Sequence, residues 1–227
     1  MCYAELEGDL KLDSDRLFDL FWNARENWTE EPNVRRNGTS GVTRAVFNEE
    51  IVYIKKQTNH LHRNLRHPFG RPTALREAEA LGIARKLGIT VPDTLFCATR
   101  RAAGVRQTVL VTRGLYDFQS LDDFTAQTLV NSQEQEQIIR TAAQPLAKLH
   151  RNRWQHSALY AKHIMLARKG DGFEIALIDL EKMHRRLTSR QASRHDLDQL
   201  SRHQNCWDQT RWGQFLEEYR VAFTQNW

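Results

Sequence analysis

The chain has 227 residues, of which 40% are hydrophobic and 27% are charged, so it can form one large domain or two small lobes around a packed core. Its longest apolar runs span only a few residues, whereas a membrane-spanning helix needs about 20. The formal net charge of +5 favours anionic partners. Three widely spaced cysteines indicate reduced thiols in the cytoplasm, and the acidic first 12 residues are not expected to form a secretory signal.

The first half of the chain is expected to be rich in β-strands and to contain two helices. Helices are expected where apolar residues recur every three or four positions, and strands where they alternate with polar ones. Glycine and proline mark turns and the ends of elements. In order, the expected elements are a helix over residues 13–28, a loop over 30–41, a hairpin over 42–47 and 51–55, an irregular basic segment over 60–71, a helix over 73–88 and a hairpin over 94–98 and 108–112.

The second half is expected to be mainly helical, and the segment Arg113-Gly114-Leu115 is a candidate hinge before it. We therefore expect an α+β organisation, with a β-rich N-terminal lobe over residues 1–112 and a helical C-terminal lobe over 113–227. Pro145 interrupts the first helical pattern, so a kink or a later start is expected there. The expected elements are a helix over 133–149, a short hairpin over 164–166 and 175–178, and helices over 196–203 and 207–223.

A lysine on a strand is one recognisable part of a phosphoryl-transfer site, since this chemistry is mainly positioning and charge neutralisation. The run Val52-Tyr53-Ile54-Lys55 matches the V-A-I-K pattern of kinase-like enzymes in residue type and strand context. Val52 and Ile54 point to one face of the strand, so Lys55 lies on the other. Lys55 is the expected ligand of the nucleotide phosphates, although the adjacent Lys56 competes for the role.

A helix carboxylate should pair with that lysine, and a glycine-rich turn should hold the phosphates through backbone N–H groups. Glu77 lies on the apolar face of its expected helix, where an unpaired carboxylate would be badly placed, and Glu79 is the alternative. The candidate phosphate-binding glycines are Gly38 and Gly41, in a run that begins at Asn37 directly before a hairpin. An ordinary turn explains this run equally well.

The most informative stretch is His156-Ser157-Ala158-Leu159-Tyr160-Ala161-Lys162-His163. An expected hairpin follows it, and Asp179 lies at the end of the apolar second strand of that hairpin. In kinase-like enzymes the first of these segments has the pattern H-R-D-x-x-x-x-N, and the second is a strand that ends in D-F-G. The first carries the catalytic aspartate, and the second carries the aspartate that holds magnesium. His156 and Asp179 stand at the expected places. Ala158 occupies the position of the catalytic aspartate, and His163 occupies the position of the asparagine.

His156, Lys162 and His163 are the candidate catalytic residues. Lys162, or Tyr160 on the same loop, could neutralise the charge of the phosphoryl group in transfer. His163 could bind magnesium together with Asp179 through a ring nitrogen; magnesium prefers oxygen, so a structural hydrogen bond is the alternative for this histidine. Asp196 could anchor the 156–163 loop from a buried helix start, or simply cap that helix.

Three groups of residues resemble the lipopolysaccharide core kinase family, the InaA and WaaP group of bacterial kinase-like proteins, and more closely its InaA branch. They are Tyr53-Ile54-Lys55-Lys56-Gln57 with His67-Pro68-Phe69-Gly70-Arg71-Pro72-Thr73, then Arg76-Glu77, and residues 155–164 with Ile178-Asp179-Leu180-Glu181. The resemblance implies a protein-kinase-like bilobal fold in the cytoplasm of a Gram-negative bacterium. It also implies that Lys55 holds the nucleotide phosphates, Glu77 orients Lys55 and Asp179 binds magnesium.

The function implied by the resemblance is phosphorylation of a sugar of the lipopolysaccharide core, heptose or 3-deoxy-manno-octulosonic acid, or of a related small molecule. ATP and Mg²⁺ are the implied cofactors, an anionic sugar is the implied acceptor, and peripheral contact with the inner face of the inner membrane stays open. Active members carry aspartate where this chain has Ala158, so a pseudokinase that binds nucleotide or phosphosugar and regulates a stress response is the alternative. No nucleic acid is expected, since the basic clusters contain only one aromatic residue, Phe69.

Overall fold

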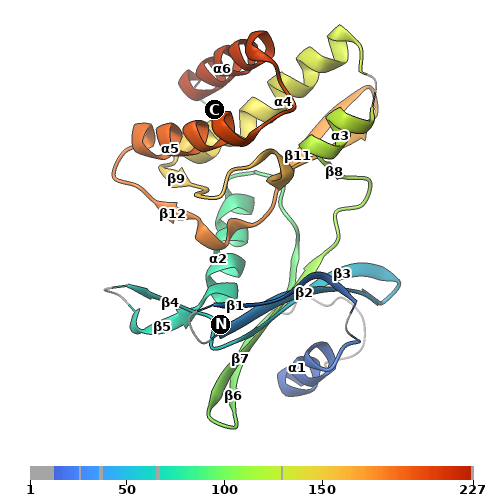
Figure 1. Cartoon of the computed structure of the whole chain (residues 1–227), viewed down its shortest axis with the longest axis vertical. Coiled ribbons are helices and arrows are strands. Elements are labelled where there is room, and N and C mark those ends of the chain that lie inside the picture. Colours follow the sequence, from blue (N-terminus) through green and yellow to red (C-terminus); the bar gives the residue numbers. More distant parts are fainter. Residues whose placement is uncertain (1–12, 26, 36–37, 65–66, 129, 226–227) are drawn as a thin grey trace. The chain divides into compact units, whose positions relative to one another are not determined.

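Figure 1 shows the computed structural model, which describes residues 13–25, 27–35, 38–64, 67–128 and 130–225. The chain divides into two compact units. One unit comprises Met1–Gly82 and Pro92–Gly114, and the other comprises Ile83–Val91 and Leu115–Trp227. From Leu115 onward, the whole chain belongs to the second unit.

An antiparallel sheet of five strands, in the order β1-β2-β3-β7-β6, forms the centre of the first unit (Figure 1). The strands are β1 (Trp28–Arg35), β2 (Gly38–Phe47), β3 (Glu50–Thr58), β6 (Thr94–Ala102) and β7 (Val105–Arg113). The turn residues Asn48 and Glu49 have positive φ, as do Ala103 and Gly104. This conformation is the one that two-residue hairpin turns favour, so both expected hairpins close tightly.

Two helices cover opposite faces of this sheet (Figure 1). Helix α1 (Ser14–Trp22) buries Leu17, Phe18 and Phe21 against one face. Strand residues buried in the same cluster are Val52, Ile54, Leu95, Phe96, Val109 and Val111. Helix α2 (Thr73–Lys86) packs on the other face, where its Ala74 meets Cys97 and Leu110. Because Leu110 alternates with its two valine neighbours, a single strand supplies both cores.

The expected loop over residues 30–41 is wrong, because these residues form most of β1 and the start of β2. β1 is an edge strand, so Pro32 can occupy it although proline donates no ladder hydrogen bond. A Cβ atom on Gly41 would lie 2.8 Å from the ring of Trp28 and 3.1 Å from Cα of Pro32. Pro32 is therefore compatible with an edge strand, and Gly41 allows two strands to pack closely, so neither residue indicates a loop here.

The basic segment over residues 60–71 was expected to be irregular, and this expectation is also wrong. It contributes to an antiparallel hairpin of β4 (Leu61–Asn64) and β5 (His67–Pro72). The expected helix over 13–28 is too long, since α1 ends at Trp22 and β1 follows. Helix α2 does begin at Thr73 as expected, and Gly88 beyond its end has a φ of +66°.

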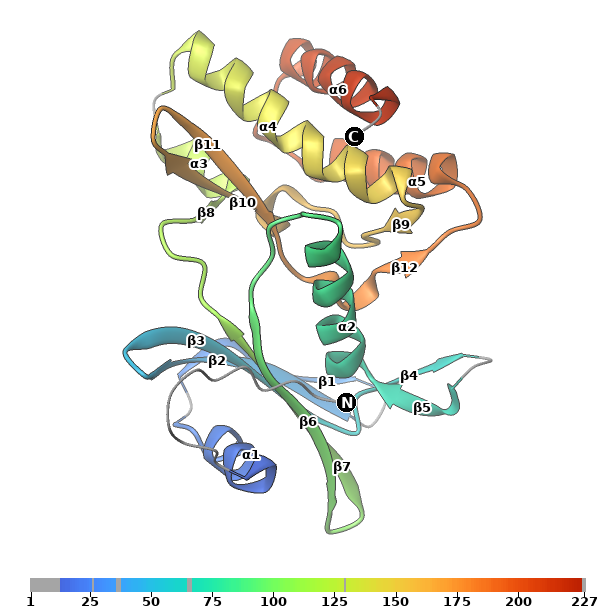
Figure 2. The ribbon, with the colours of Figure 1, turned by 180° about the vertical axis from the view of Figure 1, so that it is seen from behind.

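The second unit is mainly helical (Figure 2). In chain order its elements are β8 (Gln119–Ser120), α3 (Leu121–Gln127), α4 (Ser132–Arg151), β9 (Trp154–Gln155), η1 (Ala161–His163), β10 (Ile164–Lys169), β11 (Gly172–Leu177), η2 (Leu180–Lys182), β12 (His184–Arg185), α5 (Ser189–His203) and α6 (Gln209–Thr224). α4 packs against α5, α6 and β11. It runs through Pro145 from a capping box at Asn131, so the later start considered for this helix is wrong.

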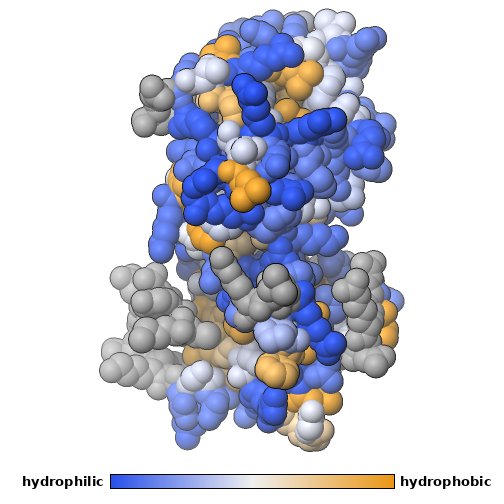
Figure 3. Space-filling model, turned by 90° about the vertical axis from the view of Figure 1, so that its left-hand side faces the viewer, coloured by the Kyte–Doolittle hydropathy of each residue, from blue (hydrophilic) through white to orange (hydrophobic). Residues whose placement is uncertain are grey.

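The face of the molecule drawn in Figure 3 is mainly hydrophilic, and its hydrophobic side chains form small separate groups outside the grey atoms. Within the described residues, no helix combines the length and the hydrophobicity needed to cross a bilayer.

Candidate nucleotide site and catalytic loop

The lysine and the glutamate expected at a nucleotide site form an ion pair in the first unit. Lys55 Nζ on β3 lies 2.5 Å from Glu77 Oε2 on α2, and the two side chains are only 14% and 12% exposed. The competing residues have other partners: Lys56 Nζ donates to the Ala24 carbonyl, and Glu79 pairs with Arg71 at 2.7 Å. The strand alternation and the helical period thus select one lysine and one carboxylate.

Gln57 fixes the start of α2 against β3 and so positions Glu77. Its Oε1 accepts a hydrogen bond of 2.9 Å from the Ala74 N–H, and its Nε2 donates to Thr73 Oγ1 at 2.8 Å. Gln57 is 1% exposed. Our sequence reasoning missed this role, although the alternation that places Lys55 toward α2 also places Gln57 there, two residues further along the strand.

Replacing Gln57→Leu should destabilise the fold by about 1–3 kcal/mol, because the buried Ala74 N–H loses its partner and the Thr73 hydroxyl keeps only its contact with His60. Urea denaturation would measure the change in the free energy of unfolding. Gln144→Leu is the matched control, since Gln144 is an exposed residue of α4. Equal stability of the two variants would contradict the anchoring role of Gln57.

The two candidate phosphate-binding glycines lie in β2, and each meets neighbouring chain closely. A Cβ atom on Gly38 would lie 2.6 Å from the Asn59 carbonyl oxygen. A Cβ atom on Gly41 would likewise collide with the ring of Trp28. Close packing alone accounts for glycine at both positions, and their contact with phosphate stays a prediction. Asn37, the start of the expected turn, lies outside the described residues.

In the second unit, a buried carboxylate holds the start of the 156–163 loop. Asp196 Oδ2 accepts a hydrogen bond of 2.6 Å from the His156 N–H, and Oδ1 accepts one of 2.9 Å from the Ser157 N–H. Ser157 has a φ of +68°, a left-handed conformation that these bonds stabilise. The expected anchor is therefore present, but the expected helix start is wrong: α5 begins at Ser189, and Asp196 lies well inside it.

The charge of Asp196 is balanced within the unit. Burial works to raise its pKa, but the hydrogen bond and charge of His150 and the N–H of Ser157 more than offset burial, so the pKa lies below that of an ordinary aspartate. His150 Nε2 lies 3.0 Å from Asp196 Oδ2, and its Nδ1 lies 2.9 Å from the hydroxyl of Tyr219 on α6. The anchor thus joins α4, α5 and α6 to the loop.

His156 links the loop to the strand that precedes Asp179. Its Nδ1 accepts a hydrogen bond from the Ala158 N–H, so the ring proton must be on Nε2, which donates to the Ile178 carbonyl at 3.0 Å. Burial is the largest influence on this ring and lowers its pKa to about 4. At neutral pH His156 is therefore a neutral group with both nitrogens engaged, which suits positioning; direct catalysis by it stays a prediction.

The low pKa of His156 should make stability depend on pH. An unfolded histidine titrates near 6.5, so between about pH 6.5 and 4 the unfolded chain binds a proton that the folded chain excludes. Stability should fall by up to about 3 kcal/mol as the pH falls through this window.

The variant His156→Gln keeps a donor for the Ile178 carbonyl and removes the titration. We expect the wild type to lose more stability than this variant between pH 7 and pH 4, measured by urea denaturation at each pH. Equal losses in the two proteins would show that folding does not lower the pKa of His156.

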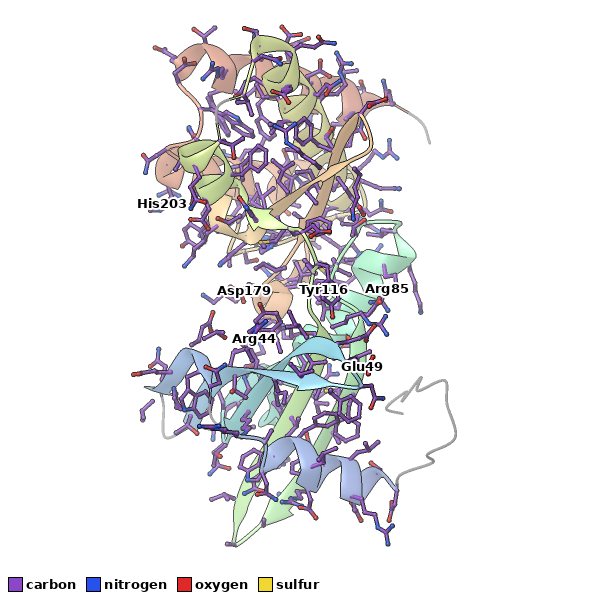
Figure 4. All side chains as sticks on the ribbon, turned by 90° about the vertical axis from the view of Figure 1, so that its right-hand side faces the viewer. Arg44, Glu49, Arg85, Tyr116, Asp179 and His203 are labelled. Atoms are coloured by element: carbon purple, nitrogen blue, oxygen red, sulfur yellow. The ribbon has the colours of Figure 1, made fainter. Side chains whose placement is uncertain are left out.

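Asp179 and His163 converge in the same unit. Asp179 follows β11 in the left-handed region, with φ 58° and ψ 52°, and its side chain is 39% exposed (Figure 4). His163 Nδ1 lies 2.7 Å from the Ala158 carbonyl, and His163 Nε2 lies 3.6 Å from Asp179 Oδ2. Since a carbonyl can only accept, His163 Nδ1 carries a proton and donates this hydrogen bond. Ala158, at the position of the missing carboxylate, is buried.

Lys162 and Tyr160 differ in how firmly they are held. Tyr160 accepts a hydrogen bond of 2.9 Å from Gln199 Nε2 on α5, whereas Lys162 is exposed, with Nζ 5.9 Å from the centre of the Tyr160 ring. Asp122 on α3 also interacts electrostatically with Lys162; burial and the neighbouring Asp123 raise the pKa of Asp122, while Lys162 and His163 lower it. Sequence reasoning missed Asp122, because the seven-residue helix that carries it was not expected.

The chain is similar to known proteins along most of its length. The profile of the lipopolysaccharide kinase (Kdo/WaaP) family matches residues 19–219. Protein InaA of Escherichia coli (strain K12) is 34% identical over 205 residues, which are 89% of this chain and 94% of that protein.

A solved structure of WaaP in complex with acyl carrier protein matches this structure with a TM-score of 0.64 at 17% identity. The match covers 90% of this chain and 86% of that chain. At this identity the likeness concerns the fold alone. It confirms the expected α+β, protein-kinase-like fold, with an antiparallel sheet in the N-terminal part and helices in the C-terminal part.

Proposed function

Because the chain belongs to the lipopolysaccharide kinase (Kdo/WaaP) family, we propose that it is an ATP-dependent phosphotransferase. The acceptor would be a sugar hydroxyl of the lipopolysaccharide core or of a related small molecule. The observation that carries the proposal is the partly buried ion pair of Lys55 and Glu77, on the strand and the helix where a kinase-like site needs it.

The candidate residues of the two units would have distinct tasks. Lys55, oriented by Glu77, would neutralise the phosphates of ATP, while Lys162 would offset charge on the phosphoryl group in transfer. Asp179 would hold the divalent ion, and Mg²⁺ is the ion expected from the sequence. The half-exposed carboxylate of Asp179 fits Mg²⁺, which prefers oxygen; the nitrogen of His163 fits it less well.

Phosphoryl transfer requires that the acceptor oxygen bond to the γ-phosphorus, that the bond from this phosphorus to ADP break, and that the hydroxyl proton leave. With Ala158 in the chain, no carboxylate stands at the usual place to take that proton. A general base is worth about 10²–10⁴-fold in rate, and the loose transition state demands little of one. We therefore propose a slow kinase.

Ala158 favours one alternative, a pseudokinase that binds a nucleotide or a phosphosugar and acts by binding. This alternative shares the nucleotide site and differs only in turnover. Transfer of labelled phosphate from ATP to core sugars would separate the two: transfer supports the kinase, and nucleotide binding without transfer to any core sugar supports the pseudokinase.

Isothermal calorimetry of ATP with a divalent ion tests the nucleotide site itself. We expect the wild type to bind, and Lys55→Met and Asp179→Ala each to raise the Kd by at least about tenfold, since each removes a charge that faces the phosphates or their metal. Asp171→Ala is the matched control, because Asp171 is exposed in the β10–β11 turn. A wild-type protein that binds no nucleotide would overturn the proposal.

We also propose that the hairpin β4–β5 mediates peripheral contact with an anionic lipid surface. Phe69 on β5 is 88% exposed, and the nearby side chains of Arg63 and His67 are exposed as well. An exposed aromatic ring beside basic groups suits the boundary between lipid headgroups and acyl chains.

Sedimentation with vesicles that contain phosphatidylglycerol tests this contact. Phe69→Ser should weaken binding about 3- to 10-fold, since the ring would leave the lipid, whereas Leu187→Ser is the control at another exposed apolar residue. Equal binding of both variants and the wild type would contradict a role for the hairpin.

A further inference from the structure

We propose that the acceptor is a sugar chain that already carries phosphate groups, and that a basic surface beside the 156–163 loop binds these groups. We call this surface the arginine face, and it consists of Arg153, Arg185, Arg186 and Arg190. The inference rests on the proposed phosphotransferase function and deepens it, since it names the chemical class of the acceptor.

Two segments of the second unit contain basic residues and no acidic ones. Residues 148–155 and 182–194 together carry eight Lys and Arg side chains and no Asp or Glu. The eight are Lys148, Arg151, Arg153, Lys182, Arg185, Arg186, Arg190 and Arg194. Since the net charge of the whole chain is +5, the rest of the chain is net negative. The positive excess of the protein is therefore concentrated in these two segments.

The fold places the two segments side by side. Strands β9 and β12 pair antiparallel with Arg185 opposite Trp154, and Figure 2 shows this pair in the second unit. At the next position the Arg186 N–H donates to the Arg153 carbonyl at 2.7 Å. Helix α5 starts shortly after β12 and carries Arg190 in its first turn. The four arginines therefore belong to neighbouring segments of backbone.

The arginine face lacks the acidic partners that arginines elsewhere in the chain have. Arg153, Arg185 and Arg190 are exposed, and within the described residues no hydrogen bond or ion pair involves their side chains. By contrast, ion pairs of 3.2 Å or less hold Arg71, Arg100, Arg113, Arg168 and Arg220. Because like charges repel, a group of unbalanced cations lowers stability until an anion joins it. This surface is therefore suited to an anionic ligand.

One arginine of the face is already oriented. Arg186 Nε donates to Gln155 Oε1 at 2.5 Å, and Gln155 is 1% exposed. Gln155 Nε2 in turn donates to Ser157 Oγ at 2.9 Å. A guanidinium group has five N–H donors in one plane, so the two terminal nitrogens of Arg186 can bind two oxygens of one anion. The buried glutamine thus prepares this side chain for bidentate binding.

The arginine face adjoins the 156–163 loop within the same unit. His184 Nδ1 on β12 lies 3.1 Å from Ser157 Oγ, so the strand meets the loop directly. Gln155, which orients Arg186, is the residue before His156. A molecule bound on the arginine face can therefore extend along the loop where the acceptor hydroxyl would react.

The number and type of the cations favour phosphate groups. Six of the eight basic residues are arginine, whose planar fork matches the oxygens of a phosphate. A phosphate monoester carries about 1.5–2 negative charges at neutral pH, more than one carboxylate, so a few phosphates on one sugar chain balance the group. Nucleic acid fits less well, because Trp154 is the only aromatic residue of the two segments. An earlier phosphoryl transfer to the same sugar chain must then supply this acceptor.

Isothermal calorimetry with deacylated lipopolysaccharide, a soluble phosphorylated sugar chain, tests the arginine face. The same sugar chain after removal of its phosphates with hydrofluoric acid is the matched ligand. We expect the full-length wild type to bind the phosphorylated chain at least about tenfold more tightly than the matched ligand. The double variant Arg185→Gln/Arg190→Gln should weaken that binding at least about tenfold. Arg211→Gln/Arg220→Gln, which makes the same change of charge at exposed positions of α6, should weaken it by no more than about twofold.

Equal binding of the two sugar chains would show that phosphate is not recognised and would overturn the inference, as would equal binding of the Arg185→Gln/Arg190→Gln variant and the wild type. Two further ligands test other anions. A double-stranded DNA oligonucleotide that binds more tightly than the phosphorylated chain, or phosphatidylglycerol vesicles that no longer bind the variant, would assign the face to nucleic acid or to lipid headgroups and overturn the inference.

Calorimetry with ATP and a divalent ion separates this inference from the proposed function. The Arg185→Gln/Arg190→Gln variant should bind the nucleotide as the wild type does. Nucleotide binding without any binding of the phosphorylated chain would overturn the inference alone. Binding of the phosphorylated chain by a wild type that binds no nucleotide would overturn the proposed function and, with it, the role of that chain as acceptor.

Discussion

The buried carboxylate of Asp196 is the constraint on which the second unit depends. A carboxylate that is fully removed from water must be hydrogen-bonded on both oxygens, and the chain satisfies it with two backbone N–H groups of the loop and a ring nitrogen of His150. The requirement is mutual, since the left-handed Ser157 needs those bonds to hold its conformation. The helices and the loop therefore cannot be placed independently of each other.

From this anchor the position of Asp179 follows through fixed contacts. Asp196 holds the backbone of His156, the ring of His156 holds the carbonyl of Ile178, and Asp179 is the next residue. None of these contacts uses the side chain at position 158, where only the backbone N–H and carbonyl of Ala158 take part. The loss of a catalytic aspartate can thus remove a base and leave the loop that carried it unchanged.

The sequence predicted the site better where local periodicity coincided with burial. The alternation of Val52 and Ile54 correctly placed Lys55 opposite the core, and the helical period placed Glu77 on the buried face of α2. Local signals failed where tertiary position decided the outcome. Pro32 indicated a loop, but an edge strand tolerates it.

The position of Asp196 shows a second kind of failure. An aspartate near a helix start is commonly a cap, and only its partners on the distant loop reveal that it lies inside α5 as an anchor. Gln57 is similar, because its contacts with Thr73 and Ala74 join segments that no local pattern relates. Such residues are polar and buried. The periodicity of the sequence can predict that they are buried, but it cannot predict which distant residue they bind.

The two departures from the kinase pattern, Ala158 and His163, do not weigh equally. In a loose transition state the proton of the acceptor is lost late, so a base contributes modestly, whereas the metal neutralises charge on the phosphates throughout the reaction. At a position that binds the metal, a substitution would therefore affect transfer more than the loss of the aspartate. The 2.7 Å bond from His163 to the Ala158 carbonyl joins the two positions, so the backbone at position 158 orients the ring at position 163.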